Sequence, residues 1–279
     1  MTVKISFITF TYNNVTLLKG LLKNIYDVVD EIIIVDGYST DGTIEVAESY
    51  NATVYLRPAK GFVEPERMFA ISKARHEWIL YLDPDERLNK KLKNELRNIL
   101  DHYKKECSAF RIRRVNVTRT GKLLLGIYWD DFQVRIFKKA HVRYRGKIHE
   151  QPIVKGDIVQ LRDEYLIIHL WQEGLWSQKQ VKYAQIQVQQ YDQPLVKSVV
   201  RKTLYDMGPF CVIPLWFAYV FYPLLGKKPI NATTILYSIR PALYDGLVAT
   251  LLNIKTIKML VHKSCRNKRK DVDEVLGLF

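Results

Sequence analysis

Residues 78–86 read Trp-Ile-Leu-Tyr-Leu-Asp-Pro-Asp-Glu, an apolar run that leads into an acidic turn. The apolar part, Trp78–Leu82, has the length and composition of a buried strand. The turn then places Asp83 and Asp85 two residues apart, where the strand ends. Such a carboxylate pair can bind a divalent cation, because Mg²⁺ and Mn²⁺ prefer oxygen ligands and often share them with substrate phosphates. The plainer alternative is a solvated acidic turn that caps the following helix.

Apolar runs and helix-like periodicities alternate along the first hundred residues. We expect strands at Lys4–Phe10, Glu31–Val35, Thr53–Leu56 and Trp78–Leu82. We expect helices at Val15–Tyr26, after Thr43, at Pro65–Ala74 and at Lys90–Tyr103. This alternation predicts the α/β class, with an open, mostly parallel sheet flanked by helices on both faces. In open sheets of this kind, ligands bind beyond the carboxyl ends of the strands.

Two more polar loops follow expected strands, namely Thr9–Asn14 and Asp36–Thr43. The topology alone would bring both loops and the acidic turn to one edge of the sheet. A carboxylate at a strand end, such as Asp36, can accept hydrogen bonds from a base ring, and the glycines of its loop permit turn conformations that other residues avoid. Either loop could instead be a turn or a helix cap without a ligand.

The three loops, in this order and spacing, resemble the motifs of the family 2 glycosyltransferases, which have the GT-A fold. The matching residues are Thr9–Asn13, Asp36–Thr43 and Asp83–Asp85. The resemblance implies an inverting transfer of a hexose from a nucleoside-diphosphate sugar, with Mg²⁺ or Mn²⁺ as the cofactor. UDP-hexose is the commonest donor in that family, and GDP-mannose is the second candidate.

The resemblance also implies where the donor and the metal bind. Nucleotide-sugar binding is expected at Thr9, Thr11, Tyr12, Asn13, Asp36 and Asp83, and metal binding at Asp85 together with Asp83. Lys60 and Arg67 are further candidates for the donor phosphates, since Arg can contact phosphate through two hydrogen bonds, although such residues are commonly solvated helix charges. His149 is a further candidate for the metal or the diphosphate, with a surface position at a strand end as the alternative.

An inverting transfer also needs a carboxylate that takes the proton from the acceptor hydroxyl. This base must lie across the sugar from the leaving diphosphate, which excludes the two aspartates of the acidic turn. The resemblance implies a base after the metal motif, in an acidic pair followed by an apolar residue and then Arg. We therefore expect the base to be Asp131, ranked above Asp130, with Glu150 as the rival. Asp130 and Asp131 could instead only cap a turn before a strand. Residues 128–137 and 147–150 also resemble the second half of the lipopolysaccharide-core glucosyltransferase branch, although Arg67-Met68 stands where the family commonly has Arg-Asn.

The remainder of the chain has a different character. Residues 1–100 contain 13 basic and 14 acidic side chains, which leaves 30 basic against 15 acidic in the rest. The stretch 208–226 has no charged residue, is rich in aromatic residues and is followed by Lys227 and Lys228. We therefore expect 1–107 to be the nucleotide-sugar half, 108–195 the acceptor-side half, and 196–279 a helical extension that associates with an anionic membrane surface.

This extension suggests a lipid-linked or glycolipid acceptor and a place on the cytoplasmic face of the cell membrane, either peripheral or partly inserted. Three prolines in the uncharged stretch favour helices in the plane of the membrane, with a spanning hairpin as the alternative. The first residues lack a basic stretch followed by an apolar one, so we expect no cleavable signal peptide. Three widely spaced cysteines predict neither a disulfide framework nor a zinc site and favour a reducing compartment.

Two other classes of protein share some of these features. A nucleic-acid-binding protein would explain the basic charge and the aromatic residues. We expect no nucleic acid, because the basic residues lie beside long apolar stretches, as they do in proteins at anionic bilayers. A metal-dependent nucleotidyltransferase would also use paired carboxylates, but the loop 36–43 and the lack of a Gly-rich first loop with Lys argue against it.

Overall fold

The structure, a computed structural model, describes residues 2–58, 64–118, 121–124, 131–146 and 150–171, together with 186, 213, 216, 242 and 243. The chain divides into two compact units, of which the first contains Met1–Gly174 with Pro223–Ile235 and the second Leu175–Tyr222 with Leu236–Phe279. All the continuous described stretches belong to the first unit. Most of the expected extension 196–279 lies outside the described residues. No helix in the described part of the chain is both long enough and apolar enough to cross a bilayer.

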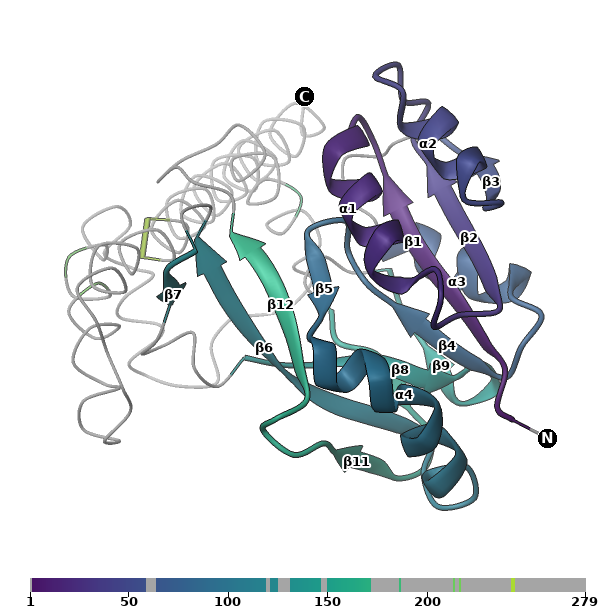
Figure 1. Ribbon diagram of the computed structural model, residues 1–279, viewed down its shortest axis with the longest axis vertical. Helices are drawn as coiled ribbons and strands as arrows, with labels where there is room; N and C mark the ends of the chain where they lie inside the picture. The colour runs from purple at the N-terminus through teal and green to yellow at the C-terminus, as the bar shows by residue number, and fades with distance from the viewer. Residues whose placement is uncertain are drawn as a thin grey trace, which may run out of the picture. The chain divides into compact units, whose positions relative to one another are not determined.

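The described strands are β1 (Ile5–Thr11), β2 (Glu31–Asp36), β3 (Thr53–Leu56), β4 (Trp78–Tyr81), β5 (Glu86–Leu88), β6 (Ala109–Thr118), β7 (Leu123–Leu124), β8 (Phe132–Lys138), β9 (Val142–Arg143), β10 (Ile153–Val154), β11 (Ile158–Gln160) and β12 (Leu166–Trp171). A ten-stranded sheet has the order β3-β2-β1-β4-β8-β6-β12-β5, with β7 and β11 paired to β6 (Figure 1). Strands β1 to β4 are parallel, as the alternating pattern predicted. β9 and β10 form a separate antiparallel pair after the 3-10 turn η2 (Lys139–His141).

The second half of the sheet comes from later in the chain. β8 runs antiparallel to both β4 and β6, so it lies between the nucleotide half and the rest. β12 is parallel to β6 and antiparallel to β5. These pairings place residues from positions 110–170 next to the acidic turn at the end of β4.

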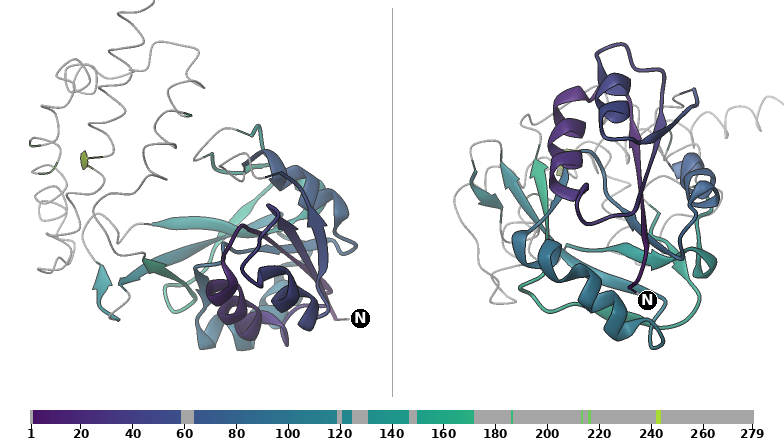
Figure 2. Two further views of the ribbon diagram at one scale, coloured as in Figure 1. Left: turned by 90° about the horizontal axis from the view of Figure 1, so that it is seen from above. Right: turned by 45° about the vertical axis from the view of Figure 1, so that its right-hand side comes forward.

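The helices are α1 (Val15–Ile25), α2 (Thr43–Ser49), α3 (Glu64–Lys73) and α4 (Lys90–Tyr103). Figure 2 shows α1, α2 and α4 on one side of the sheet and α3 on the other. The alternation of side chains along a strand explains this division. Ile32 and Ile34 of β2 belong to the core cluster under α1, whereas Ile33 and Val35 belong to the cluster under α3.

The segment after the acidic turn differs from the expectation. The sequence predicts that the turn leads into a helix, but Glu86–Leu88 forms β5 and pairs with β12 before that helix begins. The cap of α4 is Asn89, whose side chain accepts a hydrogen bond from the Leu92 amide at 3.0 Å. The acidic residues therefore do not cap α4, so the capping part of the plainer explanation is wrong, and the turn as a metal site stays a prediction.

Candidate active site

The first two polar loops are held together by Asp36, which is fully buried at the end of β2. Its carboxylate accepts a hydrogen bond from the Thr11 hydroxyl at 2.7 Å. It also accepts bonds from the Ser39 amide at 2.7 Å and from the Ser39 hydroxyl at 2.6 Å. In this structure Asp36 thus shapes the loop, and its oxygens face the protein. The predicted contact of Asp36 with a nucleotide base stays a prediction.

The exposed side chains of the loops after β1 and β2 include aromatic rings and an amide. Tyr12 and Tyr38 are 55% and 54% exposed. The Thr40 amide donates to Asn13 Oδ1 at 2.9 Å, and the Asn13 amide donates to Ser39 Oγ at 2.7 Å. Asn13 and Tyr38 both have positive φ angles, +51° and +66°, a conformation that needs such local support in residues other than glycine. The loops therefore present two tyrosine rings to solvent on a tightly bonded backbone.

The residues predicted to bind the nucleotide at the end of β1 differ in solvent exposure. Thr9 is fully buried, and its hydroxyl has no hydrogen-bond partner within the described part of the chain. Thr11 is also buried and bonds to Asp36. Tyr12 and Asn13 are the members of this loop that a nucleotide could touch without any rearrangement.

Asp83 lies at the end of β4 in contact with two side chains. One carboxylate oxygen accepts a hydrogen bond from the Tyr81 hydroxyl at 2.6 Å, and the other accepts one from Arg135 Nη2 at 2.7 Å. Burial opposes the ionisation of Asp83, but the Arg135 guanidinium and the Tyr81 hydroxyl lower its pKa to about 2. Asp83 is therefore ionised throughout the neutral range, with both oxygens engaged.

Asp131 is the centre of a second group of polar side chains. Its carboxylate accepts hydrogen bonds from Arg114 Nε at 2.7 Å, Gln133 Nε2 at 2.6 Å and Asn116 Nδ2 at 3.3 Å. Burial opposes its ionisation, but the Arg114 guanidinium and the amide hydrogen bonds hold the pKa of Asp131 below its ordinary value. The structure thus surrounds the predicted base with donors that keep it ionised and oriented.

Asp85 lies close to His169, a residue of β12 that the sequence analysis missed. His169 Nε2 is 3.5 Å from Asp85 Oδ2, and the Leu170 amide donates to the Asp85 carbonyl at 2.8 Å. The other ring nitrogen, Nδ1, is 2.6 Å from Asn116 Oδ1. The Nδ1 contact with an amide oxygen fixes the orientation of the ring, and metal-bound histidines are commonly oriented in this way.

This donor set fits a divalent cation. A carboxylate oxygen and an oriented imidazole nitrogen lie side by side, and both are suitable ligands for Mn²⁺. Within the described residues no group of three His, Cys, Asp or Glu side chains could hold a metal ion, and the predicted metal binding at Asp85 stays a prediction. The oxygens of Asp83 are turned toward Tyr81 and Arg135 instead.

Arg67 lies beneath the surface, 8% exposed, and is not a solvated helix charge. Its guanidinium stacks at 4.9 Å from the ring centre of Tyr144, and Nη1 donates to the Glu150 carbonyl at 3.2 Å. The Glu150 carboxylate accepts hydrogen bonds from the amides of Arg145 and Gly146. Arg67 and Glu150 are therefore in direct contact with each other. Lys60, Asp130 and His149 lie outside the described residues.

Several residues near the acidic turn were given no role by the sequence patterns. Glu86, Arg114, Asn116, Arg135 and His169 come from four different strands. Glu86 adjoins the acidic turn and Arg135 lies in the segment 128–137, whereas the other three belong to no recognised motif. Strand alternation could have shown that they face one side of the sheet, but not that these strands are neighbours.

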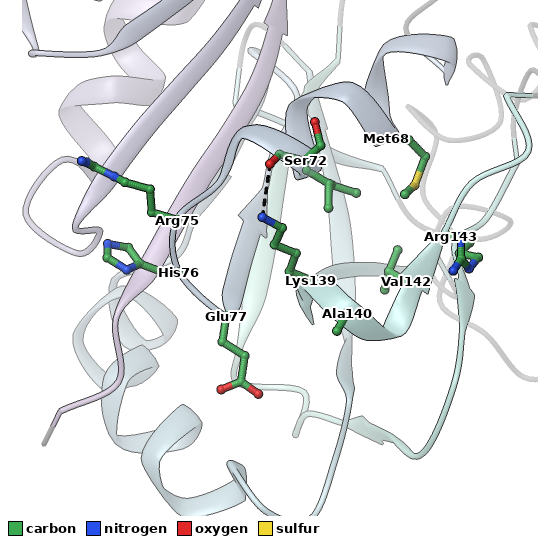
Figure 3. Close-up of a pocket in the computed structure, with 10 residues that line it drawn as sticks. Met68, Ser72, Arg75, His76, Glu77, Lys139, Ala140, Val142 and Arg143 are labelled. Carbon is green, nitrogen blue, oxygen red and sulfur yellow. Dashed lines mark hydrogen bonds between the residues drawn. The ribbon is translucent and has the colours of Figure 1, made fainter.

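A cleft of about 550 Å³ lies elsewhere, at the amino end of β4. Its lining includes Met68, Arg75, Glu77, Lys139 and Arg143. Figure 3 shows that Arg75, Glu77 and Arg143 point away from one another, and Lys139 donates to the Ser72 carbonyl at 3.2 Å. Ligands of parallel sheets bind at the opposite, carboxyl ends of the strands, where the three polar loops meet. We therefore place the active site there and not in this cleft.

Comparison with solved structures identifies the fold. The chain matches Staphylococcus aureus TarS 1-349 in complex with UDP-GlcNAc with a TM-score of 0.50 and 14% identity, over 91% of this chain and 92% of that chain. The mannosyltransferase PcManGT from Pyrobaculum calidifontis, in complex with GDP-Man and Mn²⁺, gives a TM-score of 0.50 at 14% identity, over 91% and 88% of the two chains. The fold is that of the GT-A glycosyltransferases.

The family follows from the sequence match. The profile of glycosyl transferase family 2 covers residues 6–154, which is more than half of the chain. The chain belongs to glycosyl transferase family 2, so the predicted family and fold are confirmed. An uncharacterized glycosyltransferase of Rickettsia conorii is 34% identical over 123 residues, 44% of this chain and 43% of that protein. One of Rickettsia typhi is 30% identical over 169 residues, 59% and 58% of the two proteins. The chain thus spans less than two thirds of the length of these relatives.

Proposed function

We propose that this glycosyltransferase moves a hexose, with inversion and with a divalent metal ion, from a nucleoside-diphosphate sugar to a lipid-linked or glycolipid acceptor at the cytoplasmic face of the membrane. The observation that carries the reaction is the meeting of Asp83, Asp85, His169 and Asp131 at the carboxyl end of the sheet. The described complexes of TarS with UDP-GlcNAc and of PcManGT with GDP-Man and Mn²⁺ support a nucleotide-sugar donor and a divalent cation.

Each residue has a chemical task in this proposal. Asp85 and His169 would hold the metal ion, which supplies positive charge to the leaving diphosphate. The acceptor oxygen forms a bond to the anomeric carbon while the bond from that carbon to the diphosphate oxygen breaks. The hydroxyl proton passes to Asp131. Because its pKa is lowered, Asp131 is a weak base, so it accepts the proton only once the hydroxyl has begun to bond to the sugar and has become acidic.

The membrane part of the proposal comes from the charge and composition of 196–279. An uncharged aromatic stretch flanked by basic residues suits the boundary between lipid headgroups and acyl chains. An enzyme held there reaches a lipid-linked acceptor without extracting it from the bilayer.

A donor screen tests the reaction class. The purified chain is incubated with UDP- and GDP-sugars, with Mn²⁺ and a membrane lipid extract, and release of nucleoside diphosphate is measured. We expect release from one donor that rises with added lipid extract and stops in excess EDTA. Release of pyrophosphate would point to a nucleotidyltransferase instead, and a salt-sensitive shift of RNA or DNA would revive the nucleic-acid alternative.

Metal binding is measured separately from turnover. Mn²⁺ is titrated with the wild-type chain, with Asp85→Asn and with His169→Ala, each in the presence of UDP. The electron paramagnetic resonance signal reports the concentration of free Mn²⁺. Both variants should weaken Mn²⁺ binding by about 10-fold or more, since each removes one direct ligand. Wild-type affinity in both variants would remove Asp85 and His169 from the metal site.

A further inference from the structure

The acidic turn contains a third carboxylate, Glu86, which no part of the proposed mechanism uses. We infer that Glu86 is a positioning residue that holds the donor-side Asp83 and the acceptor-side Asp131 in one fixed arrangement. The inference rests on the proposed function, because it takes Asp131 as the base. Glu86 acts through two arginines and contacts neither the sugar nor the acceptor.

Glu86 is the first residue of β5 and is fully buried. One oxygen, Oε1, accepts hydrogen bonds from Arg135 Nη2 at 2.8 Å and from Arg114 Nη1 at 2.9 Å. The other oxygen, Oε2, accepts a bond from the Asp83 amide at 3.0 Å. A single buried carboxylate therefore holds the backbone of the acidic turn and two guanidinium groups.

The two arginines lead to opposite sides of the proposed reaction. Arg135 of β8 donates to Asp83 at 2.7 Å through the same nitrogen that bonds to Glu86. Arg114 of β6 donates to Asp131 at 2.7 Å through Nε while its Nη1 bonds to Glu86. The contacts form one chain, Asp83 to Arg135 to Glu86 to Arg114 to Asp131. This chain crosses from the donor side to the acceptor side.

Glu86 is needed in this chain because the two guanidinium groups carry like charges. Both approach the same oxygen, and in a buried site two cations without a shared anion repel each other strongly. Without the Glu86 charge the arginines would move apart, and each would take its own aspartate with it. A displacement of about 1 Å between the base and the reacting carbon can cost about 100-fold in rate.

A purely structural role makes a different prediction. Buried ion networks often contribute little net stability, and the loss of one member lowers the amount of folded protein. In that case donor binding and transfer would fall together, in proportion to the unfolded fraction. A positioning role lowers the rate of transfer for each donor-loaded, folded molecule.

The test is Glu86→Gln in the full chain. Calorimetry gives its donor-binding stoichiometry, and thermal unfolding gives its stability. Its kcat and KM are measured for the donor identified in the screen. Gln has the same size but lacks the charge that both arginines share. We expect kcat per binding-competent molecule to fall about 100-fold, with donor KM within about threefold of wild type. Glu95→Gln is the matched control. Glu95 is a half-exposed carboxylate of α4 bonded to Tyr165, and its variant should keep wild-type kcat.

A second variant keeps the inference testable if Glu86→Gln unfolds. Arg114→Lys retains the charge, but one ammonium cannot reproduce the contacts that Nε and Nη1 make with two carboxylates. It should show the same selective loss of kcat. The control is Arg113→Lys, at the preceding position of β6, where the arginine contacts Asp163. This variant should keep wild-type kcat.

Three results would overturn the role of Glu86. Wild-type kcat in Glu86→Gln and Arg114→Lys would do so, and so would a parallel loss of donor binding, stability and kcat. A wild-type chain that binds none of the nucleotide sugars would contradict the proposed function itself, and the role of Glu86 with it.

Discussion

The role of each carboxylate in this site depends on which groups donate hydrogen bonds to it and on how exposed it is. Asp36 accepts three bonds from its own loops and is fully buried, so it organises backbone. Asp131 also accepts three, but these come from side chains of β6 and β8, and it keeps partial exposure at 18%. This difference in exposure marks Asp131, and not Asp36, as a group that can meet an acceptor hydroxyl.

Replacing Asp131 with Asn tests its role as the base. We expect kcat to fall by about 100- to 10,000-fold, because Asn cannot take the proton, while donor affinity stays within about threefold. Nucleoside-diphosphate release measures the first quantity and calorimetry the second. Glu150→Gln is the matched variant. If Glu150→Gln lost transfer and Asp131→Asn retained most of it, the base would be Glu150.

At the scale of elements, Arg87 joins α1 to the acidic turn. Its guanidinium donates to the Leu17 carbonyl of α1 at 2.8 Å and to the Pro84 carbonyl at 2.7 Å. Burial lowers the pKa of Arg87 to about 10, which leaves it charged at neutral pH. Gly20 makes this possible, because a Cβ there would lie 2.6 Å from Arg87 Nη2.

Gly20→Ala should therefore fail to stabilise α1. In an ordinary helix this change gains about 1 kcal/mol, but here the methyl group displaces Arg87 and removes its bond to Leu17. In an Arg87→Met background the clash is relieved and the gain of about 1 kcal/mol should return. Urea unfolding of the four proteins measures this coupling. Equal effects of Gly20→Ala in both backgrounds would show that Arg87 does not depend on Gly20.

Asp30 joins β1 to α4 away from the site. It accepts hydrogen bonds from the Ile5 amide at 2.9 Å and from Arg97 Nη1 at 3.0 Å. Burial opposes its ionisation, but these bonds, with that from Lys4, lower its pKa below the ordinary 3.8. A lowered carboxyl pKa means that the native state favours the ionised form, so Asp30 stabilises the fold above about pH 4 and this stabilisation is lost as the pH falls further.

Asp30→Asn should accordingly lower the free energy of unfolding near pH 7 by about 1–2 kcal/mol. The difference from wild type should shrink as the pH falls below about 4, because Asp30 of the unfolded wild-type chain becomes protonated there before Asp30 of the native state does. Urea unfolding along a pH series measures it, and transfer per folded molecule should be unchanged. A difference independent of pH would assign the effect to packing and not to charge.

At the scale of the whole molecule, the chain combines a balanced N-terminal third with a strongly basic remainder. The first unit contains all the described strands and the proposed active site. The part after residue 207 is basic and apolar in sequence, which is why we propose that it holds the enzyme at the membrane.

Deletion of the residues after 207 tests whether this part of the chain binds the membrane. The full chain should float with vesicles containing about one third anionic lipid, and less so in high salt, because screening weakens its attraction to lipid phosphates. The shortened chain should remain in the soluble fraction. Its binding of the nucleotide sugar, measured in the same preparation, shows whether it is folded. Equal flotation of both chains would place membrane binding in residues 1–207.

Much of the fold was predictable from local patterns. Buried strands, helix periodicity and the βα alternation identified the parallel half of the sheet, because each of these signals arises within a few residues of chain. The three polar loops at strand ends were predictable for the same reason. β1, β2 and β4 are parallel neighbours, so the loops after them necessarily meet at one edge.

The tertiary structure decided the contacts that turn this edge into a proposed catalytic site. β8 lies between β4 and β6, and β12 pairs with β5, so Arg135, Arg114 and His169 reach the acidic turn from more than 25 residues away in sequence. Such pairings depend on which strand edges find each other in the compact fold, and no local pattern encodes that choice. The sequence alone thus determined the family motifs and the parallel half-sheet, whereas the burial of Glu86, the surroundings of Asp131 and the partnership of Asp85 with His169 follow only from the folded sheet.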